Sequence, residues 1–191
     1  MPEPCDPPVM ESTYGDRLHD DRSRRVERLG AMLRRALSDG GKVFVPAFSP
    51  GRTQEPIYEM DRLFANGHLG PVPVFIDSPL GLEITRVYSR LSEFWGREAW
   101  DLRGAGDHPI HFGHLYAVEN HESHGKLLDM AGPAVIVAGG GMCTGGRILD
   151  HPRRGLSDPK NNNAIFGRSS RFRPFPLSAK GGFKIGMFRL P

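Results

Sequence analysis

The stretch best suited to chemistry is Pro133 to Leu149, PAVIVAGGGMCTGGRIL. Its apolar run, residues 134–138, is typical of a parallel strand that is buried on both faces. Two groups of glycines follow and lead through Arg147 into a predicted helix. Glycines let backbone N–H groups approach a ligand at the positive end of a helix, which suits an anion such as phosphate. The alternative is a loop whose glycines serve packing only, and the order GGGMCTGG does not match the dinucleotide pattern GxGxxG.

Three loops that carry polar residues follow predicted strands directly. Residues 49–52 follow the strand 43–48, Asp77 and Ser78 follow the strand 72–76, and the glycine turn follows the strand 134–138. Loops that follow parallel strands emerge at the carboxyl edge of the sheet, where open α/β sheets bind ligands. Arginines there can hold phosphate oxygens through paired N–H bonds. We therefore expect one anion-binding neighbourhood made of Arg52, Asp77, Ser78, the turn Gly139–Gly146 and Arg147.

Helical patterns alternate with short apolar runs along the chain. This predicts an α/β fold with a mainly parallel sheet and helices on both faces. A helix capped by Asp20 or Asp21 is expected to carry Val26, Leu29, Leu33, Ala36 and Leu37 on one face. Further helices are expected over residues 53–65, 80–95 and 120–130, a strand stub at residues 9–10, and a short strand over 115–118. The helix over 80–95 is expected to turn Leu82, Val87, Leu91 and Phe94 toward the core. Residues 1–8 are expected to be an irregular stub, 9–165 one α/β domain, 96–113 within it a long connection, and 166–191 an irregular tail that is disordered or frame-shifted.

Composition limits the class of protein. The chain has 191 residues, 38% of them hydrophobic, which is enough for one core. No apolar run approaches the roughly 20 residues that span a bilayer, and the first residues do not form a secretory signal. The lack of a spanning run predicts no membrane association. Two cysteines cannot form a disulfide framework, which predicts a reducing cytoplasm. Residues 151–191 hold nine Lys or Arg and one acid, so the basic charge belongs to the tail.

The histidines do not form a recognisable metal-binding motif. His108, His111 and His114 lie in an aperiodic stretch. His121 and His124 are spaced i, i+3 on a predicted helix and could chelate a metal, but a solvated helix face is the favoured interpretation. The sequence contains no HxHxDH, HExxH or GxSxG. We therefore predict no metal site in this chain.

Four stretches, in this order, resemble the β-CASP region of metallo-β-lactamase-fold ribonucleases: ESTYGDR from residue 11, GGKVFVPAFSPGRTQE from 40, PVFIDSPLG from 73, and VIVAGGGMCTGGRIL from 135. The resemblance covers residues 11 to about 160. It implies an α/β insert that packs over a metallo-β-lactamase domain and clamps single-stranded RNA between the two domains. It also implies a role in RNA processing or decay.

The resemblance also implies roles for particular residues. Glu11 matches an acidic motif whose carboxylate orients the histidine that protonates the leaving group, which is a supporting catalytic role. The residues that match loops lining the RNA cleft are Arg52, Ser78, Gly139, Gly140, Gly141, Thr144, Gly145, Gly146 and Arg147.

The chain departs from the family in what surrounds this region. The family uses two zinc ions to generate the attacking hydroxide, but this sequence contains neither the zinc motifs nor the general-acid histidine. Asp150 and Pro152 stand where relatives usually carry His and Leu. Similarity stops near Asn163, and the Arg-, Phe- and Pro-rich sequence beyond is typical of a shifted reading frame. We therefore expect a fragment that holds no cofactor of its own.

Three hypotheses follow. The first is the RNA-binding β-CASP part of a zinc-dependent ribonuclease, which is not catalytic alone. The second is a stand-alone regulatory or scaffold module that partners a nuclease. The third is an enzyme acting on small phosphorylated ligands, for which the sequence shows no general base. The expected partners are single-stranded RNA and a metallo-β-lactamase domain, and a homodimer is also compatible with the sequence.

Overall fold

The computed structural model describes residues 12, 15–16, 24–141, 143, 145–155, 158, 160–166 and 184–188, with the backbone alone for 162–166 and 184–188. Several expectations lie outside the described residues. These are the roles of Glu11 and Thr144, the strand stub at residues 9–10, and the helix cap at Asp20 or Asp21.

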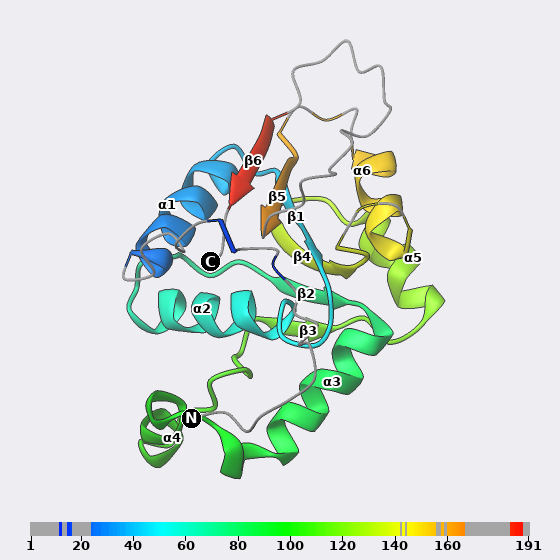
Figure 1. Cartoon of the computed structure of the whole chain (residues 1–191). Helices are drawn as coiled ribbons and strands as arrows, with labels where there is room; N and C mark the ends of the chain where they lie inside the picture. Colours follow the sequence, from blue (N-terminus) through cyan, green and yellow to red (C-terminus); the bar gives the residue numbers. More distant parts are fainter. Residues whose placement is uncertain are drawn as a thin grey trace.

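The described residues form one six-stranded sheet with every strand parallel to its neighbours (Figure 1). The strands lie in the order β3-β2-β4-β1-β5-β6. Their bounds are β1 Lys42–Ala47, β2 Val74–Asp77, β3 Leu115–Ala117, β4 Ala134–Gly139, β5 Asn162–Phe166 and β6 Lys184–Phe188.

The helices occur in the order that the sequence pattern predicts, with additions. They are α1 Arg25–Leu37, α2 Gln54–Ala65, α3 Pro79–Arg90, α4 Arg97–Gly104, α5 His121–Asp129 and α6 Asp150–Gly155. Two short 3₁₀ turns, η1 Ser92–Phe94 and η2 Arg147–Leu149, follow α3 and precede α6. No helix among these has the length and apolar content needed to cross a bilayer.

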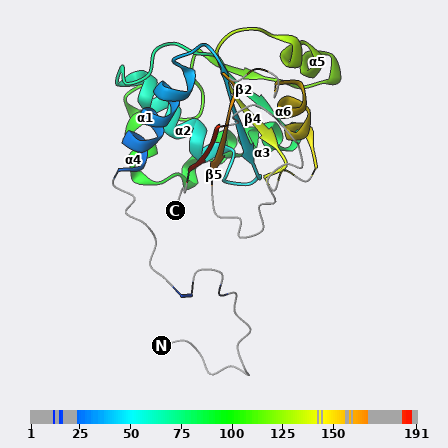
Figure 2. The ribbon, with the colours of Figure 1, turned by 90° about the horizontal axis from the view of Figure 1, so that it is seen from above.

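Both faces of the central strands are buried. On one face, Val43 and Val45 of β1 pack in a core with Leu29 of α1 and Ile57 of α2. On the other face, Phe44 packs in a core with residues of β4, α5 and η2. Neighbouring residues of a strand point to opposite faces, so two covered faces require the unbroken apolar runs seen in the sequence. Figure 2 shows α1 and α2 on one side of the sheet and α5 and α6 on the other.

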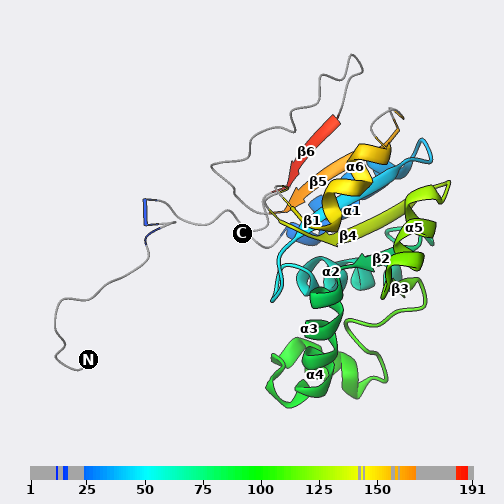
Figure 3. The same cartoon turned by 90° about the vertical axis from the view of Figure 1, so that its right-hand side faces the viewer.

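The predicted α/β fold with a parallel sheet is confirmed, and strands β1 to β4 lie within two residues of their predicted bounds. The prediction for α3 was wrong in part. That helix ends at Arg90 rather than continuing to residue 95. Leu82 is buried as expected, but Val87, Leu91 and Phe94 are 42%, 44% and 78% exposed. Figures 1 and 3 show why: α3 and α4 extend beyond the β3 edge of the sheet, away from its two cores.

Two more segments differ from expectation. Residues 97–104, predicted to be part of a connection, form α4, whose residues include no buried one. Such a helix has no apolar stripe, which is why the sequence pattern does not reveal it. Within the expected irregular tail, Lys184–Phe188 forms β6, which pairs in parallel with β5. The rest of that tail lies outside the described residues.

Candidate functional site

The three loops after β1, β2 and β4 meet at the carboxyl edge of the sheet and line a crevice of about 400 Å³. Strands β1 and β4 are neighbours, yet α2 follows β1 onto one face of the sheet and η2 follows β4 onto the other. This divergence is a topological switch point, the usual ligand site of an open α/β sheet. The lining residues are Ala47, Phe48, Ser49, Asp77, Ser78, Pro79, Leu80, Gly139, Gly140, Gly146 and Arg147.

The glycine turn after β4 is sterically tight. Gly140 and Gly146 have φ angles of 115° and 81°, which glycine adopts readily and other residues rarely do. A Cβ atom at Gly140 would lie 2.1 Å from the carbonyl oxygen of Gly145, and one at Gly141 would lie 2.4 Å from the ring of Phe48. These glycines therefore have a packing role, which was one of the two interpretations of the sequence.

The element after the turn is shorter than the sequence suggests. The chain enters η2, a three-residue turn, and then α6, which has six residues. Short helices align few peptide dipoles, so the positive helix end expected beside the turn is weak. Cys143, within the turn, has a pKa raised by burial to about 11, so its thiol stays protonated at neutral pH.

Ser78 shapes the crevice by capping α3. Its hydroxyl oxygen accepts a hydrogen bond of 3.0 Å from the backbone N–H of Gly81, and Pro79 occupies the first turn of the helix. Both features are typical of helix starts. The end of β4 packs closely against this cap, because a Cβ atom at Gly139 would lie 2.9 Å from the Ser78 hydroxyl oxygen. The Ser78 hydroxyl therefore has a structural role at the wall of the crevice.

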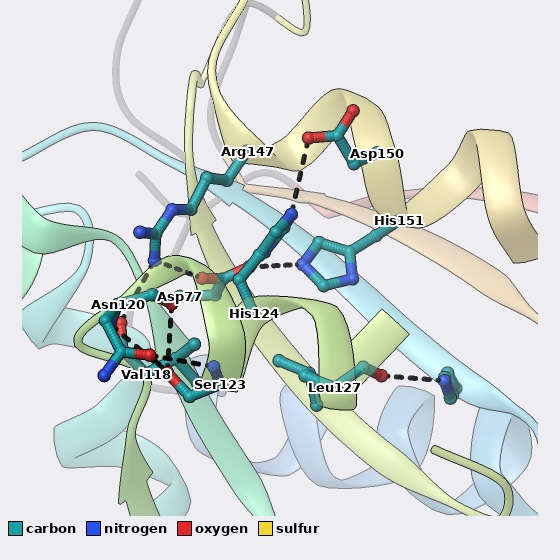
Figure 4. A network of polar contacts seen from close by, with 10 residues as sticks. Asp77, Val118, Asn120, Ser123, His124, Leu127, Arg147, Asp150 and His151 are labelled. Atoms are coloured by element: carbon teal, nitrogen blue, oxygen red, sulfur yellow. Dashed lines mark hydrogen bonds and ion pairs between the residues drawn. The ribbon is translucent and has the colours of Figure 1, made fainter. Parts of the chain in front are cut away.

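A buried polar network lies at the base of the crevice and is centred on Asp77, which is fully buried. Its Oδ2 atom lies 2.6 Å from His124 Nδ1 and 2.6 Å from His151 Nε2. Its Oδ1 atom accepts a 2.8 Å bond from Arg147 Nη1, which also donates to the carbonyl oxygen of Val118 at 3.1 Å. Figure 4 shows the three side chains converging on the carboxylate. The network thus joins β2, α5, η2 and α6.

The position of His124 corrects the sequence prediction of a solvated face. The side chain is buried, with 6% of the residue exposed. It lies on the same inward face of α5 as Leu127, three residues further on. Asn120 and Ser123 fix the start of this helix through a capping box, which sets the direction of His124. The signal in the sequence was the i, i+3 spacing of His124 and the apolar Leu127.

The electrostatics of Asp77 follow from its partners. Burial alone would raise its pKa, but hydrogen bonds from His151, Arg147 and His124 outweigh burial and hold the pKa below its ordinary value of 3.8. Asp77 is therefore an anion at neutral pH. The guanidinium of Arg147 balances that charge inside the protein, as a buried carboxylate requires.

Asp77, His124 and His151 also carry donor atoms of the type that bind metal ions, all within 4.8 Å of one another. The N···O separations of 2.6 Å are those of hydrogen bonds. Ligands placed tetrahedrally around a zinc ion at 2.0–2.2 Å would be spaced roughly 3.3 Å apart. In this arrangement the three side chains therefore fit a hydrogen-bonded network and do not fit a zinc site. Sequence reasoning missed this cluster, because its members come from three separate segments.

Arg52 lies on the far side of the loop after β1. It lines a second pocket rather than the crevice, and its Nη1 atom lies 3.3 Å from Glu55 Oε2. The loop itself is held by Gln54, whose Oε1 atom accepts a 2.9 Å bond from the Gly51 N–H. Of the predicted site residues, the structure thus gathers Asp77, Ser78, Gly139, Gly140, Gly146 and Arg147 around one crevice. Arg52 lines the neighbouring pocket.

An α/β domain with a parallel sheet is the architecture implied by the sequence resemblance. Residues 53–171, more than half of the chain, match the Beta-Casp domain family. The chain belongs to this family.

Individual relatives agree with this assignment. Ribonuclease TTHA0252 of Thermus thermophilus is 38% identical over 173 residues, which are 87% of this chain and 39% of the relative. Transcription termination factor FttA of Methanothermobacter thermautotrophicus is 29% identical over 83% of this chain and 25% of its own length. Cleavage and polyadenylation specificity factor subunit 3 of Dictyostelium discoideum is 30% identical over 84% of this chain and 20% of its own. The chain thus spans 20% to 39% of the length of these relatives.

Proposed function

We propose that this chain is the RNA-binding β-CASP part of a metal-dependent, RNA-processing nuclease, and that it binds single-stranded RNA without cleaving it alone. The observation that carries this proposal is the crevice at the carboxyl edge, where Arg147 and the glycine turn of a Beta-Casp family member meet. Relatives named as a ribonuclease and as a cleavage and polyadenylation factor support RNA as the ligand.

Arg147 is suited to hold a phosphate group in a fixed direction. Its Nη1 atom binds Asp77 and Val118, and its other N–H groups have no partner among the described residues. The side chain is 17% exposed and lines the crevice. A guanidinium that is anchored at one nitrogen loses little freedom when it binds an anion with the others. Arg147 therefore acts as an immobile phosphate contact in this proposal.

Arg52 supplies a second, more exposed contact. Its side chain is about one third exposed, and its ion pair with Glu55 is long and open to solvent. Such pairs contribute little to stability, so the pair with Glu55 does not hold the guanidinium strongly. The loop of residues 49–52 borders both cavities, with Ser49 on the crevice and Arg52 on the pocket. RNA that crosses this loop meets both arginines.

Cleavage belongs to the remainder of the parent protein in this proposal. Two zinc ions would supply the attacking hydroxide for phosphodiester hydrolysis in such an assembly. We infer that a metallo-β-lactamase domain, the proposed partner, holds these ions. In that assembly, Glu11 is proposed to orient the histidine that protonates the leaving group. We also propose that the protein acts in the cytoplasm. In this chain, the crevice residues bind and orient the RNA backbone.

The test measures RNA affinity of the full chain by fluorescence anisotropy across a salt series. Arg52→Ala should weaken binding and reduce the slope of log affinity against log salt by about 0.7, because one phosphate contact is lost. Arg35→Ala is the matched control, since Arg35 is an exposed arginine of α1 that lines neither cavity. Absence of RNA binding, or equal slopes for both variants and the unchanged chain, would refute the proposal.

A further inference from the structure

A second pocket, of about 500 Å³, lies across the loop from the crevice. Four aromatic side chains, Tyr58, Tyr88, Phe94 and Trp95, contribute to its walls, and Arg52 and Glu55 contribute charged groups. This size is within the range of small-molecule sites. A pocket with aromatic walls and a few charged groups fits a planar ligand that has polar edges.

One of these aromatic residues, Trp95, is held in place by its neighbours, and two others are exposed. Trp95 donates a 3.0 Å hydrogen bond from its indole N–H to the carbonyl oxygen of Tyr88, and its ring meets His108 edge to face at 5.5 Å. Phe94 is 78% exposed and Tyr88 37%. Exposed aromatic rings that gather at one place mark binding surfaces more often than single exposed side chains do.

An arginine lies beside one ring of the pocket, Trp95, and beside Trp100, which does not line the pocket. The guanidinium of Arg103 lies 5.9 Å from the ring centres of both Trp95 and Trp100. Among the described residues Arg103 forms no ion pair, and its polar contact is with the Ser92 hydroxyl. Glu55, the carboxylate that lines the pocket, is paired with Arg52. Aromatic rings with an arginine nearby are one pattern by which proteins bind single-stranded nucleic acid.

We propose that this pocket receives an unpaired nucleobase of the RNA whose backbone lies in the crevice. This inference rests on the proposed function and deepens it. The loop of residues 49–52 separates the two cavities, so a nucleotide whose phosphate contacts Arg52 presents its base to the aromatic walls. Gln54 holds the loop by accepting from Gly51 N–H and by donating to the Thr85 hydroxyl, both at 2.9 Å.

A nucleobase fits this pocket better than an apolar helix of a partner protein. A base has two faces that stack on aromatic rings and an edge of hydrogen-bond donors and acceptors. Glu55 offers an acceptor to such an edge, while Arg52 contacts the phosphate. An apolar helix would instead leave both charged groups buried and without water, which is costly.

The test compares two ligands on the full chain, a short oligouridylate and an abasic RNA of the same length. Phe94→Ala should weaken oligouridylate binding at least fivefold, because one stacked base contributes about 1–3 kcal/mol. The same substitution should leave abasic RNA binding unchanged. Tyr116→Ala is the control, because Tyr116 is an aromatic residue with 46% exposure that lines neither pocket.

A second readout uses the two tryptophans of the chain. In a Trp100→Phe variant, Trp95 alone reports on the pocket, and oligouridylate should quench its fluorescence where abasic RNA does not. Equal effects of Phe94→Ala on both RNAs, or none on either, would overturn the base-site proposal. If Arg52→Ala still lowers the salt slope in that case, the proposed function stands. If Phe94→Ala instead abolishes self-association in sedimentation and leaves RNA binding intact, the occupant is a second copy and the proposal is wrong.

Discussion

Arg147 and Asp77 form a buried ion pair, with 2.8 Å between Nη1 and Oδ1 and 17% and 0% of the two side chains exposed. Arg147, which the sequence predicts to bind phosphate, is therefore already paired with a carboxylate of the protein itself. This pair fixes the glycine turn, through η2, to the end of β2. The same contact that orients the guanidinium toward the crevice also stabilises the walls of the crevice.

Removal of Asp77 should destabilise the protein strongly. Asp77→Ala leaves Arg147 buried without its counter-charge, and it leaves His124 and His151 without their acceptor. Breaking a buried pair in this way costs about 3–5 kcal/mol. Urea unfolding followed by circular dichroism measures the change. Asp150→Ala is the control, since Asp150 is half exposed and should cost less than about 1 kcal/mol. Similar values for the two variants would contradict a central role of Asp77.

The pH dependence of stability should carry the signature of Asp77. Burial alone would raise its pKa. The hydrogen bonds from His151, Arg147 and His124 lower the pKa by more than burial raises it, so the pKa lies below the ordinary 3.8. A carboxylate of depressed pKa contributes stability that is complete above its unfolded pKa and is lost as the pH falls through its folded pKa. The free energy of unfolding should therefore fall below about pH 4 more steeply in the unchanged chain than in Asp77→Asn. If the free energy of unfolding falls equally steeply in the two proteins at acid pH, another group is responsible.

The sequence predicts the position of Asp77 but not the partners that it meets. Asp77 directly follows a short apolar run, and parallel-sheet geometry places such a residue at the carboxyl edge. Its partners are not locally encoded, because His124 and His151 are 47 and 74 residues away in the chain. Periodicity shows that α5 has an inward face but not which carboxylate that face meets.

The error at α3 has a different cause. Its apolar residues recur at helical spacing, so the pattern correctly predicts an amphipathic helix. A pattern does not show whether the molecule supplies a surface for each apolar face. Leu82 meets the core, whereas Val87, near the end of the helix, and Leu91, directly after it, are exposed. Figure 3 shows that α3 extends beyond the β3 edge of the sheet. The aromatic pocket beside α3 could therefore not be predicted from the sequence.

The glycine turn should tolerate a side chain at one position and not at another. Gly140→Ala should destabilise by about 1–3 kcal/mol, because its φ of 115° disfavours other residues and the added Cβ would meet Gly145. Gly145→Ala is the matched control, since a Cβ there has nothing within 4 Å. Thermal unfolding of both variants measures the difference. Equal melting temperatures would mean that the turn adapts freely.

Asp61 in α2 is a carboxylate that should oppose folding at neutral pH. It is 7% exposed, and burial, with a further contribution from Asp107, raises its pKa to about 6, although His111 lowers it slightly. A carboxylate of raised pKa contributes most to stability below its unfolded pKa, and this contribution is lost as the pH rises through about 6.

Asp61→Asn should therefore stabilise the protein by about 2–3 kcal/mol at pH 8, and by less than about 1 kcal/mol at pH 4, where the folded protein holds this group protonated. Urea unfolding of the variant and of the unchanged chain at both pH values measures the two differences. Asp101→Asn serves as the control, because Asp101 is an exposed acid of α4. A gain that is the same at both pH values would mean that the substitution acts through packing and not through the charge of Asp61.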